Sequence, residues 1–284
     1  MSSPSIETEK LHGSLTAPVR RRRQPLFSIT TQVDSQRFLS IATFAFVALA
    51  LLWWGVTSSG LVKPLFLPGP EQVWARLSQL SGSGQLWSDM GISLFRISFS
   101  FFLACLMAIP LGMLIGSYRV LDAAFEPMID FIRYMPVVAF VPLSILWVGT
   151  NEPQKYLIIW LGTFFQLTLM VQDCVKRVPK DFIDVGRTLQ MREWKILRSI
   201  VLPSAAPAVW DAMRICLGWA WSWLVLAELV AASAGMGYRI TVAQRYFQTD
   251  TIIGYVLVLG LLGLASDQIM KFMGKCMFRY QERS

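Results

Sequence analysis

The chain has 284 residues, of which 54% are hydrophobic and only 15% are charged, and its formal net charge is +8. Soluble domains carry about 25% charged residues and lack long apolar runs, so this composition excludes an ordinary soluble protein. Continuous apolar runs of about 20 residues predict an all-α polytopic membrane protein. The basic residues lie at the edges of these runs, where they meet anionic membrane lipid, and this distribution argues against a nucleic-acid partner.

The N-terminal part is predicted to be a cytoplasmic tail followed by a membrane anchor. Residues 1–37 are polar and basic, and they contain an arginine run at 20–23 and the only histidine, His12. This tail is too long for a secretory n-region, and no small-x-small cleavage site follows it. Residues 38–61 are therefore expected to remain as a transmembrane anchor.

Residues 62–93 are predicted to form a periplasmic segment that contains one short helix. A Leu-Pro-Gly-Pro turn at 67–70 precedes an amphipathic stretch at 71–80, in which Trp74 and Leu77 are expected at the membrane interface. The Ser-Gly-Ser-Gly sequence at 81–84 is expected to be a flexible link.

A membrane core is predicted over residues 94–272, followed by a cytoplasmic tail at 273–284. Its expected spans are 94–118, 129–148, 156–173, 209–232 and 251–272. The span at 129–148 begins among charges and is expected to be broken by Pro136 and Pro142, since proline removes a helical hydrogen bond. Gly112 and Gly116 form a G-x-x-x-G pair, which allows close helix approach.

The distribution of lysine and arginine predicts that both termini are cytoplasmic. With the N-terminus inside, cytoplasmic segments hold 18 of these residues and outer segments hold five. Seven of the 18 lie in a charged segment at 176–207, between two apolar runs. We call this segment the coupling loop.

Two short amphipathic helices are predicted within the coupling loop. Phe182, Val185 and Leu189 share one face of a helix over 180–191. A second helix over 193–201 is expected to end at Pro203 and Pro207, before the next span. A cation-rich amphipathic surface between two spans predicts that a cytoplasmic partner binds there. Movement of this partner is expected to be transmitted to the adjoining spans.

The coupling loop resembles the cytoplasmic motif of the membrane subunits of bacterial ABC importers. That pattern is Glu-Ala-Ala, three residues, Gly, nine residues and Ile-x-Leu-Pro. The spacing is kept here, but Gln190 stands in place of the motif glycine, which is expected to change the turn between the two helices. The resemblance implies that the following residues couple to an ATPase: Asp184, Val185, Gly186, Thr188, Gln190, Ile200, Leu202 and Pro203.

Other segments resemble the nitrate/sulfonate/taurine/bicarbonate group of these permeases. They are Phe-Leu-Pro-Gly-Pro at 66–70, the stretch from Glu-Pro at 126–127 to Pro-Leu-Ser-Ile-Leu-Trp at 142–147, Ala-Glu-Leu-Val-Ala-Ala-Ser at 227–233, Gly-Met-Gly-Tyr at 235–238 and Phe-Gln-Thr-Asp at 247–250. The resemblance covers residues 66–271, which is most of the chain.

This resemblance implies a type I importer fold of five core spans plus one N-terminal span, paired with a second copy of the chain in the bacterial inner membrane. Two cytoplasmic ABC ATPase subunits and a periplasmic or lipid-anchored solute-binding protein are the implied partners. The chain contains no G-x-x-x-x-G-K-[ST] phosphate-binding loop, so ATP and Mg²⁺ are expected on the ATPase. The chain itself is expected to bind no cofactor and to be a non-catalytic subunit, and its cysteine spacing matches no metal or redox pattern.

Several polar residues within spans are candidates for a translocation path. Glu228 is expected near the outer third of its span, where water could reach it. Two roles are open for it: a gate or path residue, or a partner that binds a neighbouring helix through Arg239. Ser222, Gln166 and Thr168 are hypothesised to donate hydrogen bonds to a small anion. Trp219 is interpreted first as a packing or interfacial residue and second as pore lining.

A charged pair near the start of the third span admits two interpretations. Arg133 and Asp130, with Glu126, are expected to form a structural ion-pair cluster at the cytoplasmic end of that span, or else a cytoplasmic gate.

The leading functional hypothesis is therefore the permease subunit of an ATP-driven importer for a small anion. An ion-coupled secondary carrier with Glu228 as its proton relay is the alternative, and it predicts transport without any ATPase. An intramembrane enzyme is disfavoured, because the single histidine lies in the tail and no span carries paired carboxylates or a serine with a base.

Overall fold

The computed structural model describes residues 35–278. The predictions for His12, for the arginine run at 20–23 and for residues 279–284 lie outside the described residues. The chain divides into two compact units, residues 1–53 and 54–284, so the N-terminal helix is taken by itself. This helix, α1 (Ser35–Ser58), contains a 20-residue, largely apolar stretch, Leu39–Ser58, with a mean hydropathy of 2.1, which is long enough to cross a bilayer.

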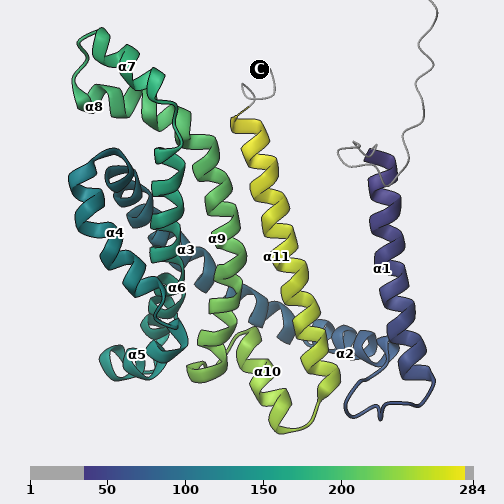
Figure 1. Cartoon of the computed structure of the whole chain (residues 1–284). Coiled ribbons are helices and arrows are strands. Elements are labelled where there is room, and N and C mark those ends of the chain that lie inside the picture. The colour runs from purple at the N-terminus through teal and green to yellow at the C-terminus, as the bar shows by residue number, and fades with distance from the viewer. Residues whose placement is uncertain (1–34, 279–284) are drawn as a thin grey trace, which may run out of the picture. The chain divides into compact units, whose positions relative to one another are not determined.

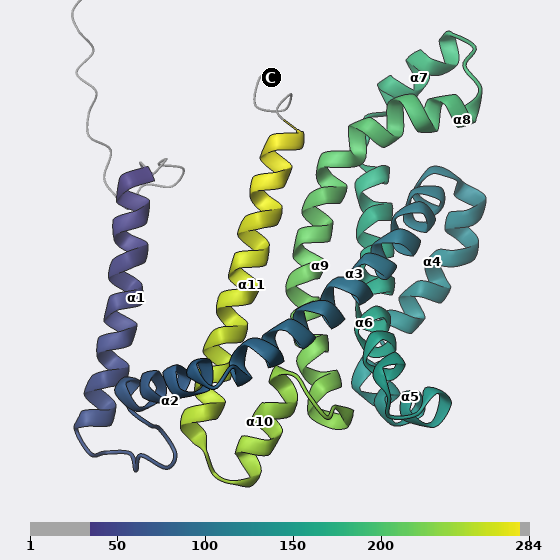
Figure 2. The same ribbon diagram turned by 180° about the vertical axis from the view of Figure 1, so that it is seen from behind.

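The second unit is a bundle of helices, with no strand among residues 54–278 (Figures 1 and 2). Its elements are α2 (Pro70–Gly82), α3 (Gln85–Ser117), α4 (Arg119–Arg133), η1 (Val137–Ala139), α5 (Phe140–Val148), α6 (Glu152–Lys176), α7 (Lys180–Thr188), α8 (Glu193–Ile196), η2 (Leu197–Val201), α9 (Leu202–Ala231), α10 (Met236–Arg245) and α11 (Thr249–Met277). Five helices of the described chain are long and apolar enough to span a membrane, or six if the bent pair of α4 and α5 is one span.

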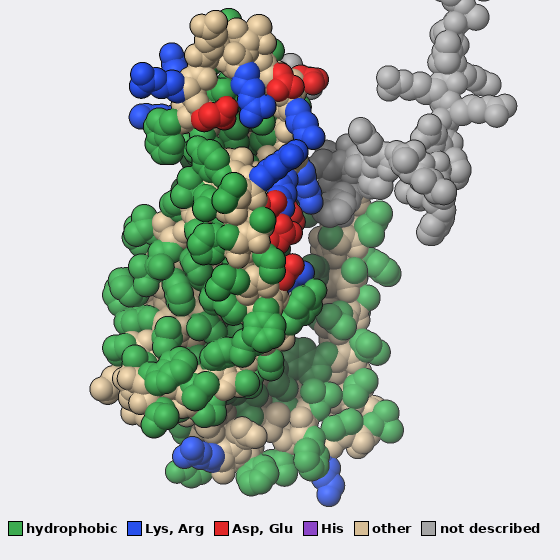
Figure 3. All heavy atoms as spheres, turned by 60° about the vertical axis from the view of Figure 1, so that its left-hand side comes forward, with side chains coloured by type: hydrophobic (Ala, Val, Ile, Leu, Met, Phe, Trp, Pro, Cys, Tyr) green, Lys and Arg blue, Asp and Glu red, His purple; other side chains and the backbone are tan. Residues whose placement is uncertain are grey.

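The two ends of this bundle differ in composition. Helices α7 and α8 lie at one end, which we call the coupling end, and α5 and α10 lie at the other, the far end (Figures 1 and 2). Figure 3 shows charged side chains gathered mostly at the coupling end, above a broad apolar belt. Such a belt is the surface that lipid hydrocarbon requires.

Helix α2 forms where a short amphipathic helix is predicted. Pro70 starts it, and the Gln72 side chain accepts a hydrogen bond from the Gly69 N–H (3.3 Å). Trp74 is exposed, and Leu77 packs against Gly254 of α11. The expected four-residue link is also shorter, since α2 continues to Gly82 and α3 begins at Gln85.

The core is built on α6, which packs against both α3 and α9. Gly112 and Gly116 let α3 approach α6 closely, as the G-x-x-x-G pair predicts. A Cβ atom at Gly112 would lie 2.5 Å from the Thr168 carbonyl oxygen, and one at Gly116 would lie 2.8 Å from that of Gln172. The two helices therefore meet backbone to backbone.

The third span is broken as predicted, but at one proline only. Helix α4 and the η1–α5 segment meet at a 75° bend, and Pro136 lies between them. Pro142 does not break α5, because it lies in the first turn, where the N–H that proline lacks has no helical partner anyway. The break thus follows from the position of each proline in its helix.

The prediction that Pro203 and Pro207 end the second coupling helix is wrong. The helix runs without interruption from Glu193 to Ala231, with Pro203 in the first turn of α9 and Pro207 inside it. The π-helical turn η2 immediately precedes Pro203, and such turns absorb a change of hydrogen-bond register. One continuous helix, bent where α8 passes into α9 (Figures 1 and 2), therefore joins the coupling loop to the far end.

We predict that Gly112→Ala destabilises the bundle, because its Cβ atom has no room against α6. The expected loss is about 1–3 kcal/mol, typical of overpacking. Gly91→Ala on the same helix is the matched control, because nothing lies within 4 Å of its Cβ position. Thermal unfolding in detergent measures both variants, and equal midpoints would contradict the close approach.

Candidate functional site

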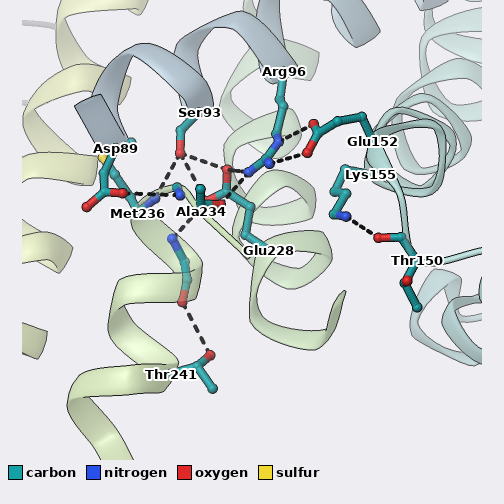
Figure 4. A network of polar contacts seen from close by, with 12 residues as sticks. Asp89, Ser93, Arg96, Thr150, Glu152, Lys155, Glu228, Ala234, Met236 and Thr241 are labelled. Carbon is teal, nitrogen blue, oxygen red and sulfur yellow. Dashed lines mark hydrogen bonds and ion pairs between the residues drawn. The ribbon is translucent and has the colours of Figure 1, made fainter. Parts of the chain in front are cut away.

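A cluster of buried charges joins the core helices near the far end (Figure 4). Arg96 of α3 is only 1% exposed. Its Nη1 atom forms an ion pair with Oε1 of Glu228 on α9 (2.9 Å), and its Nε atom donates to Oε2 of Glu152, the first residue of α6 (2.7 Å). Nη1 also donates to the carbonyl oxygen of Ala234 (2.7 Å). A single guanidinium thus connects α3, α6, α9 and the loop after α9.

The Glu228 carboxylate is fully engaged within this cluster. The Ser93 hydroxyl donates to Oε1 (2.7 Å), and the Gly237 N–H donates to Oε2 (2.8 Å). Ser93 in turn accepts from the Met236 N–H (3.0 Å), so α10 is held as well. Burying two opposite charges is favourable only when their remaining hydrogen-bonding capacity is also satisfied, and here it is.

A second buried carboxylate attaches α10 and α11 to α3. Oδ2 of Asp89 accepts from Nε of Arg239 (2.8 Å) and from the Tyr255 hydroxyl (2.9 Å). The Gly235 N–H donates to Oδ1 of Asp89 (3.3 Å). Gly235 has φ +107°, and a Cβ atom there would lie 2.5 Å from Oε1 of Glu228, so both backbone and space require glycine.

These contacts revise the predictions for Glu228. The residue lies in the last turn of α9, but it is 1% exposed, so the expected contact with water is wrong. It is the partner of a neighbouring helix, through Arg96 rather than Arg239. Sequence reasoning assigned no role to Arg96, Asp89 or Glu152. The sequence feature that could have identified these residues is that each is a charged residue within or next to a long apolar run.

The coupling loop folds into two short helices packed on each other. Gly186 of α7 is buried, and a Cβ atom there would lie 2.8 Å from Cδ1 of Ile200 and 3.1 Å from Cγ1 of Ile196. Thr188 donates to the Asp184 carbonyl oxygen (2.9 Å). Leu202 and Pro203 form the start of α9, so the end of the motif belongs to the span itself.

Gln190 occupies a position that glycine normally takes. Helix α7 ends in a Schellman motif, in which the Gln190 N–H donates to the Arg187 carbonyl (2.8 Å) and the Met191 N–H donates to the Gly186 carbonyl (3.0 Å). Gln190 has φ +55°, in the left-handed region. The turn is therefore made without glycine, at a steric cost of roughly 1–2 kcal/mol.

The candidate path residues separate into two groups. Gln166 and Trp219 line a cavity of ≈ 250 Å³ together with Arg133. Thr168 is buried and its hydroxyl donates to its own helix at the Phe164 carbonyl (2.8 Å), and Ser222 is exposed outside that lining. Glu228 belongs to the charge cluster described above.

Arg133 and Asp130 form an ion pair (3.0 Å), as expected, but not at the expected depth. They lie at the end of α4 away from the coupling end, a distance of roughly 20 Å along the helix axis. Glu126 pairs with Lys176 (3.0 Å) and not with Arg133. The predicted position at the cytoplasmic end of the span is wrong for the pair.

Comparison with known proteins places this architecture in a family. The family described as "Binding-protein-dependent transport system inner membrane component" matches residues 108–278, more than half of the chain. The chain belongs to this family. It is accordingly an ABC importer permease subunit of the inner membrane.

Relatives within the family include permeases named for small anions. The chain is 33% identical over 259 residues to the taurine transport system permease protein TauC of Escherichia coli K12, covering 89% of this chain and 90% of that protein. It is 29% identical over 245 residues to the bicarbonate transport system permease protein CmpB of a Synechocystis strain, covering 82% and 86%. The permease therefore groups with the taurine, sulfonate and bicarbonate branch of the family.

Solved importers share the fold. The membrane subunit of the MetNI methionine ABC transporter in an inward-facing conformation is 20% identical, with a TM-score of 0.56, covering 66% of this chain and 92% of that chain. An amino acid ABC transporter is 15% identical with a TM-score of 0.55, covering 70% and 97%. The prediction of a type I importer permease fold is confirmed.

We predict that the Arg96 cluster is a main source of the permease's stability. Arg96→Met leaves the buried Glu228 carboxylate without its cation, which should cost about 3–5 kcal/mol. Arg187→Met is the control, since its partners lie 3.5 and 3.6 Å away on an exposed surface, and it should cost less than about 1 kcal/mol. Thermal midpoints that fall equally in both variants would contradict this role.

We predict that Gln190→Gly stabilises the coupling loop by about 1 kcal/mol, because glycine tolerates positive φ. Thr188→Gly, two residues earlier in α7, should have the opposite effect, since glycine weakens a helix by about 1 kcal/mol. Proteolysis of the loop in the purified permease measures both changes. Faster cleavage of Gln190→Gly than of the unchanged chain would show that Gln190 makes compensating contacts.

Proposed function

We propose that this permease carries a small oxyanion or organic sulfonate across the inner membrane, powered by ATP hydrolysis on partner subunits. The observation that carries the proposal is the surface of the coupling loop. Four apolar side chains of this loop are each more than half exposed at the coupling end of the bundle: Phe182, Val185, Leu189 and Trp194. Apolar side chains gathered on a charged surface indicate a protein partner.

The partner that fits this surface is an ABC ATPase, one per permease copy. The chain contains no phosphate-binding loop, so nucleotide chemistry belongs to that partner, with its own ATP and Mg²⁺. Because α8 continues through η2 into α9, a displacement of the coupling loop reaches the span directly. The motif positions Ile200, Leu202 and Pro203 lie on this connection, and Gly186 of α7 packs against it at Ile196 and Ile200.

The remaining parts of the complex follow from the same proposal. A second copy of the permease completes the path, and a periplasmic or lipid-anchored binding protein delivers the solute. The excess of basic residues in the tails and in the coupling loop supports cytoplasmic termini. The names of the relatives support taurine, aliphatic sulfonates or bicarbonate as the solute class.

The ion-coupled carrier has less support. A proton relay needs a carboxylate that water reaches, whereas Glu228 is 1% exposed and accepts hydrogen bonds from Arg96, Ser93 and Gly237. Its engagement in the charge cluster favours a structural role.

We predict that Trp194→Asp abolishes co-purification of the ATPase without unfolding the permease, because Trp194 is 63% exposed. The experiment is affinity purification of the tagged chain in mild detergent, after expression with its genomic neighbours. Trp74→Asp is the matched control, since Trp74 is 74% exposed on α2 and far from the coupling loop. An ATPase retained by Trp194→Asp, or lost equally in both variants, would contradict the docking surface.

A further inference from the structure

Helix α4 carries a row of charges into the apolar part of the bundle. Its charged residues recur at intervals of three and four positions, so they share one helix face. They are Arg119, Asp122, Glu126, Asp130 and Arg133. The row begins at the coupling end and, over the 15 residues of α4, extends roughly 22 Å toward the far end.

The first part of this row is neutralised within the bundle. Lys176 of α6 pairs with Asp122 (2.8 Å) and with Glu126 (3.0 Å), close to the coupling end. The second part is different, because Asp130 and Arg133 pair only with each other among the described residues. Their side chains are 41% and 35% exposed. Charges exposed to lipid at this depth are costly, so the pair must face water or protein.

Arg133 opens into the cavity of ≈ 250 Å³ at the break between α4 and η1. Gln166 of α6 and Trp219 and Trp223 of α9 also line it. Trp223 lies about 12 Å from the end of α9, and Gln166 about 15 Å from the end of α6, so the cavity is near mid-span. A water molecule takes about 30 Å³ in the liquid, so the cavity has room for a small solute with a few waters.

The polar groups of this cavity are mainly donors. The Arg133 Nε atom engages Asp130 and its Nη2 atom donates to the Tyr134 hydroxyl (3.2 Å), which leaves Nη1 without a partner among the described residues. The Trp223 Nε1 atom is buried and finds no acceptor within the described part of the chain. An indole N–H can only donate, and a buried donor without an acceptor is rare in folded proteins. The arrangement therefore lacks an acceptor, which an anion would provide.

We propose that this cavity is an anion-binding position in the middle of the membrane path, with Arg133 as the principal ligand. The Gln166 amide completes the donor set. Asp130 holds Nε of Arg133, which leaves Nη1 for the anion, and its negative charge keeps binding weak enough for release. This inference rests on the proposed function and adds to it the residue that recognises the negative charge.

The first test measures the electrostatic potential of the cavity with the chain in nanodiscs. Gln166→Cys is labelled with an anionic reagent, 2-sulfonatoethyl methanethiosulfonate, and with its cationic trimethylammonium counterpart. Exposed Cys276 in the same chain is the reference thiol. We expect the anionic reagent to be favoured at position 166 by roughly fivefold or more relative to Cys276, given one unscreened positive charge nearby.

Two further substitutions separate charge from shape. Adding Arg133→Gln should remove the preference, whereas adding Asp130→Asn should increase it. Equal rates for the two reagents at position 166, or a preference that Arg133→Gln leaves unchanged, would overturn the proposal. This labelling requires neither an ATPase nor transport, so it stands even if the proposed function fails.

The second test uses the complete transporter in liposomes, with taurine, ethanesulfonate and bicarbonate each assayed separately. Arg133→Gln should still co-purify with the ATPase and hydrolyse ATP, but uptake should fall roughly ten- to hundredfold, as expected for loss of one charge-assisted hydrogen bond. Arg133→Lys should retain part of the uptake, and Arg119→Gln on the same helix face should retain nearly all of it. Normal uptake by Arg133→Gln would overturn the proposal, whereas an unchanged chain that recruits no ATPase would overturn only the proposed function.

Discussion

The arrangement of the core helices depends on one positive charge, that of Arg96, in the interior of the bundle. Apolar helices have little preference for particular neighbours in a membrane, because lipid tails are as apolar as leucine. A buried guanidinium does have such a preference, since it requires carboxylates and carbonyl oxygens at fixed positions. Glu152, Glu228 and the Ala234 carbonyl meet that requirement from α6, α9 and the loop beyond it. The Arg96 charge therefore determines which faces of α3, α6 and α9 meet, and how far each helix is shifted along its axis relative to the others.

Most elements of the fold follow from local features of the sequence. Apolar runs locate the spans, the spacing of Gly112 and Gly116 predicts the close approach of α3 and α6, and the coupling motif predicts two short helices. The partner of Glu228 does not follow, because Arg96 is 132 positions away and only the rotation of both helices brings them together. Arg96 lies only two residues into the predicted span at 94–118, whereas α3 begins at Gln85, so Arg96 is well inside the helix.

The charges of α4 show a different limit of sequence reasoning. Residues 119–126 read as a loop between spans because a hydropathy window that contains several charges is not apolar. The same residues become a helix with one polar face once Lys176 of α6 neutralises Asp122 and Glu126. Gln190 shows the converse case, in which the motif predicts a glycine and the structure supplies its physical reason, a left-handed turn at the end of α7.

The continuous helix from Glu193 to Ala231 acts mechanically as a lever that pivots near its far end. Glu228 is fixed in the charge cluster, so the helix would pivot about this residue. Trp194 lies about 50 Å from it along the helical path, and Trp223 only about 8 Å on the same side, at 1.5 Å per residue. A tilt that moves Trp194 by about 6 Å would then move Trp223 by about 1 Å, the scale of a hydrogen bond made or broken. The geometry converts a wide swing at the coupling loop into a fine adjustment at the cavity.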